Sequence, residues 1–370
     1  MSQIICLAAE PWGDYASRSR QLISRLKNHR ILYFDPRPAG KGQRNAMTAS
    51  HKDEGQLVEK WTTCYASPPS YSHLPPMFKP LTDRLMVRYI KERMSEVGFT
   101  NPVLWLGLPH YEPLVKSIPN ELVIFDCPSE PYEYGIAENC ARTSDMTICR
   151  TREMFDLLKP FCDKTFLVKD GADFARFNTA ANEELPFPDA LFNIRNPILG
   201  LVGKIGSHLE LEYIRHAAAE HPEWSFVLIG NKDGTADLSL AEGLRNVHFT
   251  GYVEQKHLPA FLQRFDACLY LGKKDGNGPG AGILYEYLST GKPIVGTPHS
   301  LHINEYANVS YIASNPGEFV DQCKKAISER DAWKVRQRVA YGKSSSWDAR
   351  VIELNRSIQQ YVSRASQQSV

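Results

Sequence analysis

The sequence lacks the features that mark several special classes of protein. Its 370 residues contain no apolar run of 18 residues, so no membrane-spanning helix is expected. The first residues carry no basic segment ahead of an apolar one, as a signal peptide would. Lys and Arg number 43 against 42 Asp and Glu, and this balance does not call for nucleic acid as a partner. We therefore expect a cytoplasmic protein.

The eight cysteines also lack a pattern. None forms a C-x-x-C pair, and several lie inside apolar runs. Scattered cysteines of this kind are typical of buried, reduced thiols and not of a disulfide framework or a zinc site.

Short apolar runs alternate with helical patterns along both halves of the chain. Strands that alternate with helices predict parallel βαβ units, and 370 residues are enough for two domains. We therefore expect an α/β protein with two Rossmann-like parallel-sheet domains facing a cleft. The predicted strands are residues 4–8, 31–34, 103–106, 122–125, 146–149 and 165–168 in the first half, and 198–202, 226–229, 247–249, 267–271 and 293–295 in the second. Residues 37–80, rich in Pro, Ser, Gly and Lys, are expected to be irregular.

The pattern divides the chain into four parts. Residues 1–177 are predicted to be the first domain, 178–196 a linker and 197–343 the second domain. Residues 344–370 contain a helix with apolar residues at steps of four and three, from Trp347 to Tyr361. Two Rossmann-like domains are complete without this helix, so we expect it to cross back and pack on the first domain.

A glycine loop follows the predicted strand 267–271 and opens a helix. Backbone N–H groups in such a loop can approach an anion, and the helix N-terminus favours negative charge by about 0.3–1 kcal/mol. Glu286 lies further along the helix, where a carboxylate could accept hydrogen bonds from the hydroxyls of a ribose. The loop predicts a phosphate site with the candidate residues Gly278, Gly280, Gly282, Lys273 and Lys274.

A second loop, after strand 198–202, carries Gly203 and Lys204. Because parallel strands end at one edge of a sheet, the two loops can converge on one ligand. Two alternatives remain. The second loop could be a plain turn, and Gly276, Gly278 and Ala281 match a dinucleotide fingerprint, although that fingerprint normally follows the first strand of a domain.

Several ordered segments resemble family 4 retaining glycosyltransferases, and more narrowly the teichuronic-acid-type polysaccharide glycosyltransferases. They spread over most of the chain. The matching segments are Trp12 with residues 18–22 and 31–34, then 125–127, 168–177, 224–230, 246–251, 258–262, 285–295 and 347–350.

The resemblance implies the GT-B fold, with an acceptor domain followed by a nucleotide-sugar donor domain. It implies that Glu286 binds the donor ribose, that Lys204 binds the diphosphate, and that the amides from Gly278 to Gly282 hold the phosphates. It also implies contacts to the base from the turn Gly251, Tyr252 and Val253.

In the first domain the resemblance implies that Asp126, at a strand end, lies near the transferred sugar. The predicted function is transfer of a sugar from a nucleotide diphosphate sugar to a glycan or lipid-linked glycan in polysaccharide biosynthesis. The family transfers sugars with retention and without a bound metal or other cofactor, and this sequence likewise has no D-x-D triplet.

Two positions depart from the family pattern. Its carboxylate eight residues before Glu286 falls on Gly278, and its second lysine falls on Glu210. The alternatives are therefore a nucleotide-sugar epimerase or a catalytically degenerate nucleotide-sugar-binding subunit on the same scaffold.

Other residues have weaker roles. His110 follows a strand and could meet the acceptor or the donor sugar, or be an ordinary loop residue. Asp14, Tyr15 and Arg18 follow the first strand and are expected to face the same cleft. Glu130 and Glu133 could serve acceptor hydroxyls or cap the next helix. Basic and apolar residues gather on a predicted helix over 81–97, which suggests either contact with the inner face of a membrane or a solvated helix face.

Overall fold

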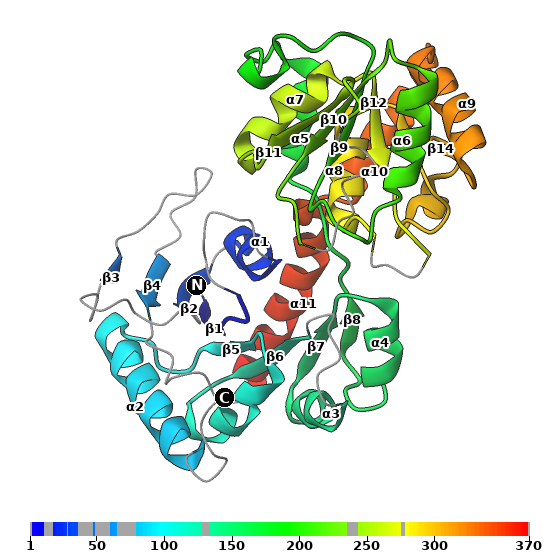
Figure 1. The fold of residues 1–370 in the computed structure, drawn as a ribbon. Coiled ribbons are helices and arrows are strands. Elements are labelled where there is room, and N and C mark those ends of the chain that lie inside the picture. The colour runs from blue at the N-terminus through cyan, green and yellow to red at the C-terminus, as the bar shows by residue number, and fades with distance from the viewer. Residues whose placement is uncertain are drawn as a thin grey trace. The chain divides into compact units, whose positions relative to one another are not determined.

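The computed structural model describes residues 2–10, 18–27, 29–35, 47–48, 60–64, 79–127, 134–234, 243–274 and 278–368. The chain forms two compact units (Figure 1). The first unit consists of Met1–Lys169 with Arg350–Val370, and the second unit is Asp170–Ala349. Each has a sheet of mainly parallel strands with helices, so the predicted α/β class is confirmed.

The first unit contains an eight-stranded sheet with the order β3-β4-β2-β1-β5-β6-β7-β8. Only β3 runs antiparallel to its neighbour. The strands are β1 (Ser2–Leu7), β2 (His29–Asp35), β3 (Met47–Thr48), β4 (Lys60–Cys64), β5 (Val103–Leu106), β6 (Leu122–Cys127), β7 (Met146–Cys149) and β8 (Thr165–Leu167). Strands β3 and β4 fall in the stretch expected to be irregular, and the expectation is wrong there. Pairing of β4 with β2 is a long-range contact that local composition does not reveal.

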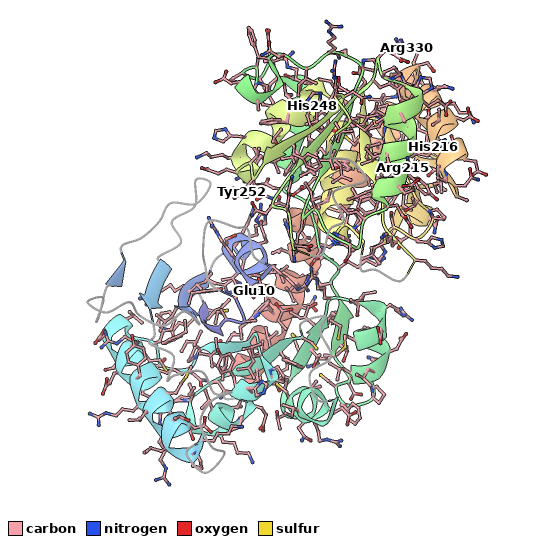
Figure 2. The ribbon with its side chains drawn as sticks, in the orientation of Figure 1. Glu10, Arg215, His216, His248, Tyr252 and Arg330 are labelled. Carbon is pink, nitrogen blue, oxygen red and sulfur yellow. The ribbon has the colours of Figure 1, made fainter. Side chains whose placement is uncertain are left out.

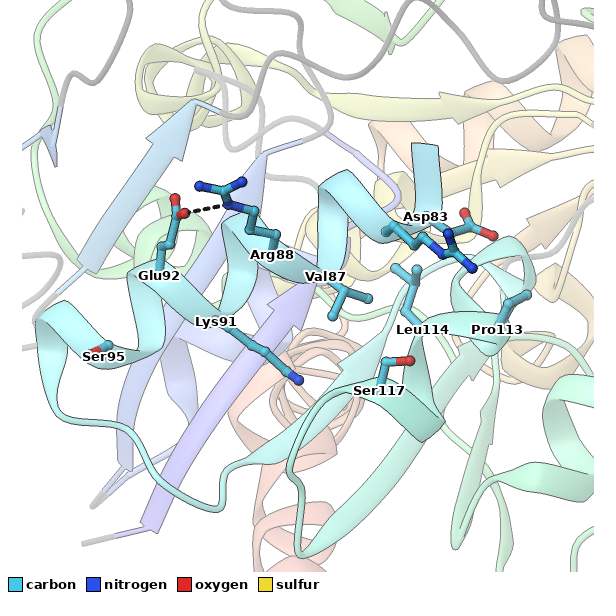
Figure 3. A pocket seen from close by; sticks show the side chains of 10 residues that line it. Asp83, Val87, Arg88, Lys91, Glu92, Ser95, Pro113, Leu114 and Ser117 are labelled. Carbon is cyan, nitrogen blue, oxygen red and sulfur yellow. Dashed lines mark hydrogen bonds and ion pairs between the residues drawn. The ribbon is translucent and has the colours of Figure 1, made fainter. Parts of the chain in front are cut away.

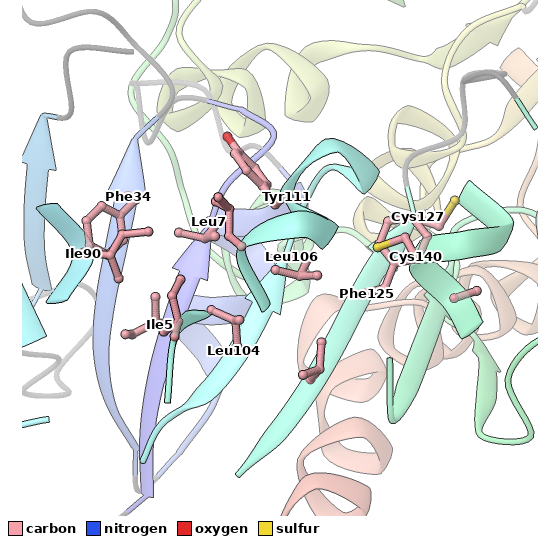
Figure 4. Close-up of a cluster of buried hydrophobic side chains, with 14 of the residues drawn as sticks. Ile5, Leu7, Phe34, Ile90, Leu104, Leu106, Tyr111, Phe125, Cys127 and Cys140 are labelled. Carbon is pink, nitrogen blue, oxygen red and sulfur yellow. The ribbon is translucent and has the colours of Figure 1, made fainter. Parts of the chain in front are cut away.

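The core of the first unit lies where helices cover one face of this sheet. Alternate residues of β1 and β5, such as Ile5, Leu7, Leu104 and Leu106, share a buried cluster with helical side chains (Figure 4). Strands β5 and β6 are buried along their whole length, as is typical of central parallel strands covered on both faces. The helices of this unit are α1 (Arg18–Arg25), α2 (Lys79–Val97), the 3-10 helix η2 (Pro109–Ser117), α3 (Tyr134–Thr143) and α4 (Arg152–Leu158).

The second unit contains a six-stranded parallel sheet with the order β11-β10-β9-β12-β13-β14. Its strands are β9 (Ile198–Val202), β10 (Ser225–Ile229), β11 (Val247–Gly251), β12 (Ala267–Tyr270), β13 (Ile294–Gly296) and β14 (Tyr311–Ile312). The strand order reverses beside β9, where the chain goes outward to β10 and then returns to β12. Ligands in open α/β sheets bind beyond the carboxyl ends of strands at such a switch point.

Helices cover both faces of the second sheet. Two of them share a buried cluster with one face, and three others share a cluster with the opposite face. The first pair is α6 (Leu211–Glu220) and α9 (Pro316–Ile327), and the second group is α5 (Phe174–Asn182), α7 (Leu258–Arg264) and α8 (Ala281–Thr290). The remaining helical segments are η3 (Asp189–Leu191), η5 (Gln255–His257), η6 (Ile303–Tyr306) and α10 (Ala332–Ser344).

The segment 178–196, predicted to be a linker, belongs to the second unit. Helix α5 begins before it, because the Asp173 side chain accepts a hydrogen bond from the Arg176 N–H and caps the helix. Phe177, Ala180 and Leu191 are buried in the core of that unit. The burial of helix α5 depends on contacts with α7 and α8, which the prolines and the few β-branched residues of the segment do not predict.

The last helix, α11 (Trp347–Gln368), begins in the second unit and continues in the first. The Ser346 hydroxyl accepts a hydrogen bond from the Ala349 N–H at 3.1 Å at its start. Within the first unit the apolar stripe is buried at Val351, Leu354 and Ile358. The Tyr361 hydroxyl donates to Asp145 at 2.7 Å. These contacts tie the C-terminal helix to the sheet of the first unit.

The seven described cysteine side chains are free and buried. Burial raises the pKa of the Cys268 thiol to about 12, which keeps it protonated and unreactive near neutral pH. Within the described ranges, no helix has the length and apolar character needed to span a bilayer.

Candidate functional site

Three neighbouring strands of the second unit end in glycines. Gly203 follows β9, Gly230 follows β10, and Gly251 ends β11, all with positive φ. The Gly230 N–H donates to the Gly251 carbonyl at 2.8 Å, and the Gly203 N–H donates to Ile229 at 2.9 Å. A Cβ on Gly230 would stand 1.8 Å from the Gly203 carbonyl oxygen. At Gly230 the backbone therefore approaches too closely for a side chain, and the positive φ of all three residues favours glycine.

The two loops that the sequence singled out lie against each other. The loop after β9 and the loop after β12 form a bridge between Leu209 and Gly272. The Lys273 N–H also donates to the His208 carbonyl at 2.9 Å. The two loops thus contact each other in the second unit, as their predicted convergence on one ligand requires.

The glycine loop leads directly into α8. Gly278 has a φ of +55°, which favours glycine, and Gly280 precedes the helix without a side-chain cap. Gly282 lies in the first turn of α8. A Cβ on Gly203 would stand 2.9 Å from Cδ1 of Ile283, so the end of β9 reaches this first turn. Uncapped amide groups at a helix N-terminus suit an anion. Gly276 lies outside the described residues.

Glu286 lies on α8, one and a half turns from its start, and is half-buried. Its Oε1 accepts a hydrogen bond from Nε2 of Gln255 at 2.9 Å. The pKa of Glu286 is raised to about 7, chiefly by burial, and the Asp173 carboxylate contributes in the same direction. The Gln255 hydrogen bond and the Arg176 guanidinium lower this pKa. Near neutral pH, then, the carboxyl group is poised between its ionised and protonated forms.

Lysines surround the loops. The Lys204 ammonium lies 3.3 Å from the Asp233 carboxylate, and 68% of its side chain is exposed. Lys273 and Lys274 are exposed beside the glycine loop. An exposed ion pair such as that of Lys204 is worth about 0–1 kcal/mol, so the ammonium can exchange Asp233 for a phosphate at little cost.

The turn from Gly251 to Val253 borders a cavity of about 880 Å³ in the second unit. Tyr252 and Val253 line it together with Arg176 and Phe187. Tyr252 lies at the surface of this unit in Figure 2, with 44% of the residue exposed. The cavity has the size of a small-molecule site and adjoins the turn that the resemblance assigns to the base.

In the first unit, Asp126 is the penultimate residue of β6 and is buried. The Arg18 Nε lies 3.3 Å from its Oδ1, and Nη2 of Arg18 donates to the Val168 carbonyl at 2.7 Å. His110 is half-buried in η2, after the neighbouring strand β5. Both residues therefore follow adjacent strands of one sheet. Trp12, Asp14, Tyr15, Glu130 and Glu133 lie outside the described residues.

Sequence reasoning missed two partners of the predicted residues. Gln255 follows the predicted turn closely enough to have been suspected, but nothing local indicates that it reaches α8. Asp233 follows β10, and its pairing with Lys204 depends on β9 and β10 being neighbours. The sequence signal that could have identified Asp233 is a carboxylate soon after β10, the strand predicted to follow β9 in the chain.

One family of known proteins matches most of the second unit. Residues 196–329 match the family model for glycosyl transferases group 1. A Bacillus subtilis (strain 168) protein with the name "Putative teichuronic acid biosynthesis glycosyltransferase TuaH" is 27% identical over 194 residues. The match covers 50% of this chain and 48% of the relative, so the chain spans about half the length of the curated relative it matches.

Solved structures resemble the whole chain. A sucrose-phosphate synthase from Thermosynechococcus elongatus has a TM-score of 0.67 and 15% identity, with 98% of this chain and 100% of that chain covered. A UDP-forming α,α-trehalose-phosphate synthase from Burkholderia vietnamiensis has a TM-score of 0.65 and 12% identity, with 96% of both chains covered. Anabaena HepE, solved with UDP and glucose, has a TM-score of 0.60 and 11% identity, with 98% and 99% covered.

Residues 196–329 thus match the model for group 1 glycosyltransferases, and this chain has the GT-B fold of two Rossmann-like units. The resemblance to glycosyltransferases is therefore confirmed for the sequence of residues 196–329 and for the fold of the whole chain. The Bacillus subtilis relative is named for teichuronic acid biosynthesis, the type of polysaccharide that the motifs indicated.

Proposed function

We propose that the protein transfers a sugar from a nucleotide diphosphate sugar to a glycan or lipid-linked glycan acceptor in polysaccharide biosynthesis. The observation that carries the proposal is the contact between the loops after β9 and β12, next to the uncapped start of α8. The group 1 domain match covers the same segments.

The second unit would hold the donor. Its diphosphate would lie at the start of α8, where amides from Gly278 to Gly282 and the Lys204 ammonium can donate hydrogen bonds. Each hydrogen bond to a charged phosphate contributes about 1.5–3 kcal/mol. Glu286 would accept the ribose hydroxyls, and the turn from Gly251 to Val253 would contact the base. The ribose and phosphate partners are thus one and a half turns apart on one helix.

In the proposed reaction, the bond between the anomeric carbon and the diphosphate oxygen breaks. The acceptor oxygen bonds to the anomeric carbon, and its proton passes to the departing diphosphate. The amides and Lys204 stabilise the negative charge that develops on the leaving group. Asp126 and His110, in the first unit, would contact the sugar or the acceptor. We further propose that the sugar is transferred with retention, which the anomeric configuration of the product tests. We also propose that transfer needs no metal ion or cofactor, and activity measured in the presence of a chelator tests the part concerning a metal.

The donor-binding part is tested by calorimetric titration with nucleoside diphosphates. Glu286→Ala removes the acceptor of the ribose hydroxyls, so we expect affinity to fall at least about tenfold. Glu220→Ala is the matched control, because Glu220 ends α6 and is half exposed at the opposite end of the strands. Equal affinities for wild type and Glu286→Ala would contradict the assignment.

The absence of a carboxylate at Gly278 favours a second candidate, a subunit that binds a nucleotide sugar without transferring it. A nucleotide-sugar epimerase on the same scaffold is the other alternative, and it would need a general acid and a general base at the site. The left-handed backbone of Gly278 would strain a side chain there. Product analysis separates the candidates. A transferase converts the donor only when an acceptor is present, an epimerase converts it alone, and a binding subunit leaves it unchanged.

We also propose peripheral contact with the inner face of a membrane through α2. Leu81 and Leu85 are 57% and 56% exposed on this helix. Arg84, Arg88 and Lys91 line a groove of about 550 Å³ between α2 and η2 (Figure 3). Exposed apolar and basic side chains on one helix suit an anionic lipid surface. A cytoplasmic location accords with the buried, free cysteines, and cosedimentation with anionic vesicles tests the contact.

A further inference from the structure

Glu286 is held by a residue from a different loop. Gln255 is the first residue of η5, which follows the turn after β11, whereas Glu286 lies on α8 after β12. The 2.9 Å hydrogen bond from the Gln255 amide to Oε1 of Glu286 joins the two segments. A donor amide at this oxygen restricts the rotation of the carboxylate and occupies one of its acceptor positions.

The charged surroundings of Glu286 come from other elements. Asp173 and Arg176 approach it from the N-terminal end of α5, and they form an ion pair with each other at 3.3 Å. At the far end of α8, the Arg338 side chain of α10 bonds to the Gly291 carbonyl and pairs with Glu329. Asp173 raises the pKa of Glu286 and Arg176 lowers it, so the two effects oppose each other. The Gln255 amide is the neutral donor that favours the ionised form of the Glu286 carboxylate.

We propose that Gln255 is a positioning residue for the nucleoside part of the donor. It fixes Oε1 of Glu286 and leaves Oε2 to accept the ribose hydroxyls, and it thereby sets the preference for ribonucleotides over 2′-deoxyribonucleotides. The inference rests on the proposed function, in which Glu286 binds the ribose.

Two measurable consequences follow. A carboxylate free to rotate, or more often protonated, accepts hydroxyl hydrogen bonds less well, so the loss of Gln255 weakens ribonucleotides more than deoxyribonucleotides. Loss of the Gln255 hydrogen bond also raises the pKa of Glu286 above its value of about 7. Because ionised Glu286 is the better acceptor, affinity rises with pH through this pKa, and the midpoint of the rise moves upward in the variant.

The experiment uses the full chain and calorimetric titration with UDP, GDP, ADP and CDP from pH 6 to 8.5. The affinity for the nucleotide that binds most tightly is then compared with the affinity for its 2′-deoxy form. In the wild type we expect a preference of about 10-fold or more for the ribonucleotide, as for one charge-assisted hydrogen bond. In Gln255→Leu we expect a preference of less than about 3-fold and a pH midpoint that is higher. A retained preference with an unmoved midpoint overturns the inference.

Control variants separate positioning from folding. Glu220→Ala changes a half-exposed residue at the end of α6, at the opposite end of the strands, and is expected to keep both the preference and the midpoint. Gln255→Asn keeps the amide but is too short to reach Oε1, so it should behave like Gln255→Leu and serves if that variant fails to fold. A uniform loss of affinity for ribo and deoxy forms at every pH would indicate a structural role and overturn the inference.

Failure of the proposed function has a different signature. If the wild type binds no nucleoside diphosphate at any pH, both the function and the inference are overturned. If binding depends on Glu286 but is unchanged in Gln255→Leu and in Gln255→Asn, only the inference is overturned.

Discussion

The two units end their central strands in different ways. In the second unit, Gly203, Gly230 and Gly251 place backbone at the edge of the sheet. In the first unit, β6 ends beside the buried pair of Asp126 and Arg18. Backbone amides can surround a phosphate without a side chain between them, whereas a buried charged pair presents oriented functional groups. We therefore expect the strand ends of the second unit to suit a diphosphate and those of the first unit to suit hydroxyl-bearing ligands.

Substitution of a glycine at the carboxyl ends of these strands gives the largest expected effect on stability. In Gly230→Ala, the new Cβ would meet the Gly203 carbonyl, and the φ of +144° is rarely adopted by other residues. We expect the free energy of unfolding, measured in urea, to fall by about 3–5 kcal/mol.

The control for this prediction lies four residues further on. A Cβ on Gly234 would meet no atom within 4 Å, so Gly234→Ala should change stability by less than about 1 kcal/mol. Equal stabilities of the two variants would show that the edge tolerates side chains, and the contrast between the units would lose its basis.

The charged pair of the first unit gives the next effect. Asp126→Ala leaves the largely buried Arg18 guanidinium without its carboxylate, so we expect a loss of about 3 kcal/mol in unfolding free energy. Asp126→Asn keeps the shape and an acceptor oxygen, and should cost less.

Functionally, both Asp126 variants should lower sugar transfer but leave the affinity for nucleoside diphosphates unchanged, because the proposed diphosphate site lies in the second unit. Weaker nucleoside diphosphate binding in Asp126→Asn, with stability retained, would contradict this separation of roles.

Prediction from sequence succeeded where structure is local. Apolar runs such as that of β9 and the glycine loop before α8 carry their signal within a few residues. Prediction failed where a long-range contact determines the local structure or the unit to which a segment belongs. Strand β4 exists through pairing with β2, and residues 178–196 belong to the second unit, where Ala180 and Leu191 are buried.

The candidate site shows the same limit. Glu286 and Lys204 could be selected from their motifs, but their partners could not. Gln255 and Asp233 come from other βα loops, and only the strand order β11-β10-β9-β12 brings them near. The roles of all these residues stay predictions until ligand binding is measured.

The exposed face of α2 gives the smallest effect on stability and extends the comparison to the surface. Leu81→Ser and Leu85→Ser together remove apolar side chains that are already more than half exposed, so unfolding free energy should change by less than about 1 kcal/mol. If this face contacts a membrane, the double variant should lose most of its cosedimentation with anionic vesicles, since binding scales with buried apolar area. The matched control is Ile352→Ser, which alters an exposed apolar residue on α11 and should keep vesicle binding. Unchanged cosedimentation of the Leu81 and Leu85 variant would make α2 a solvated helix face, and the acceptor would then have to be recognised without help from a lipid surface.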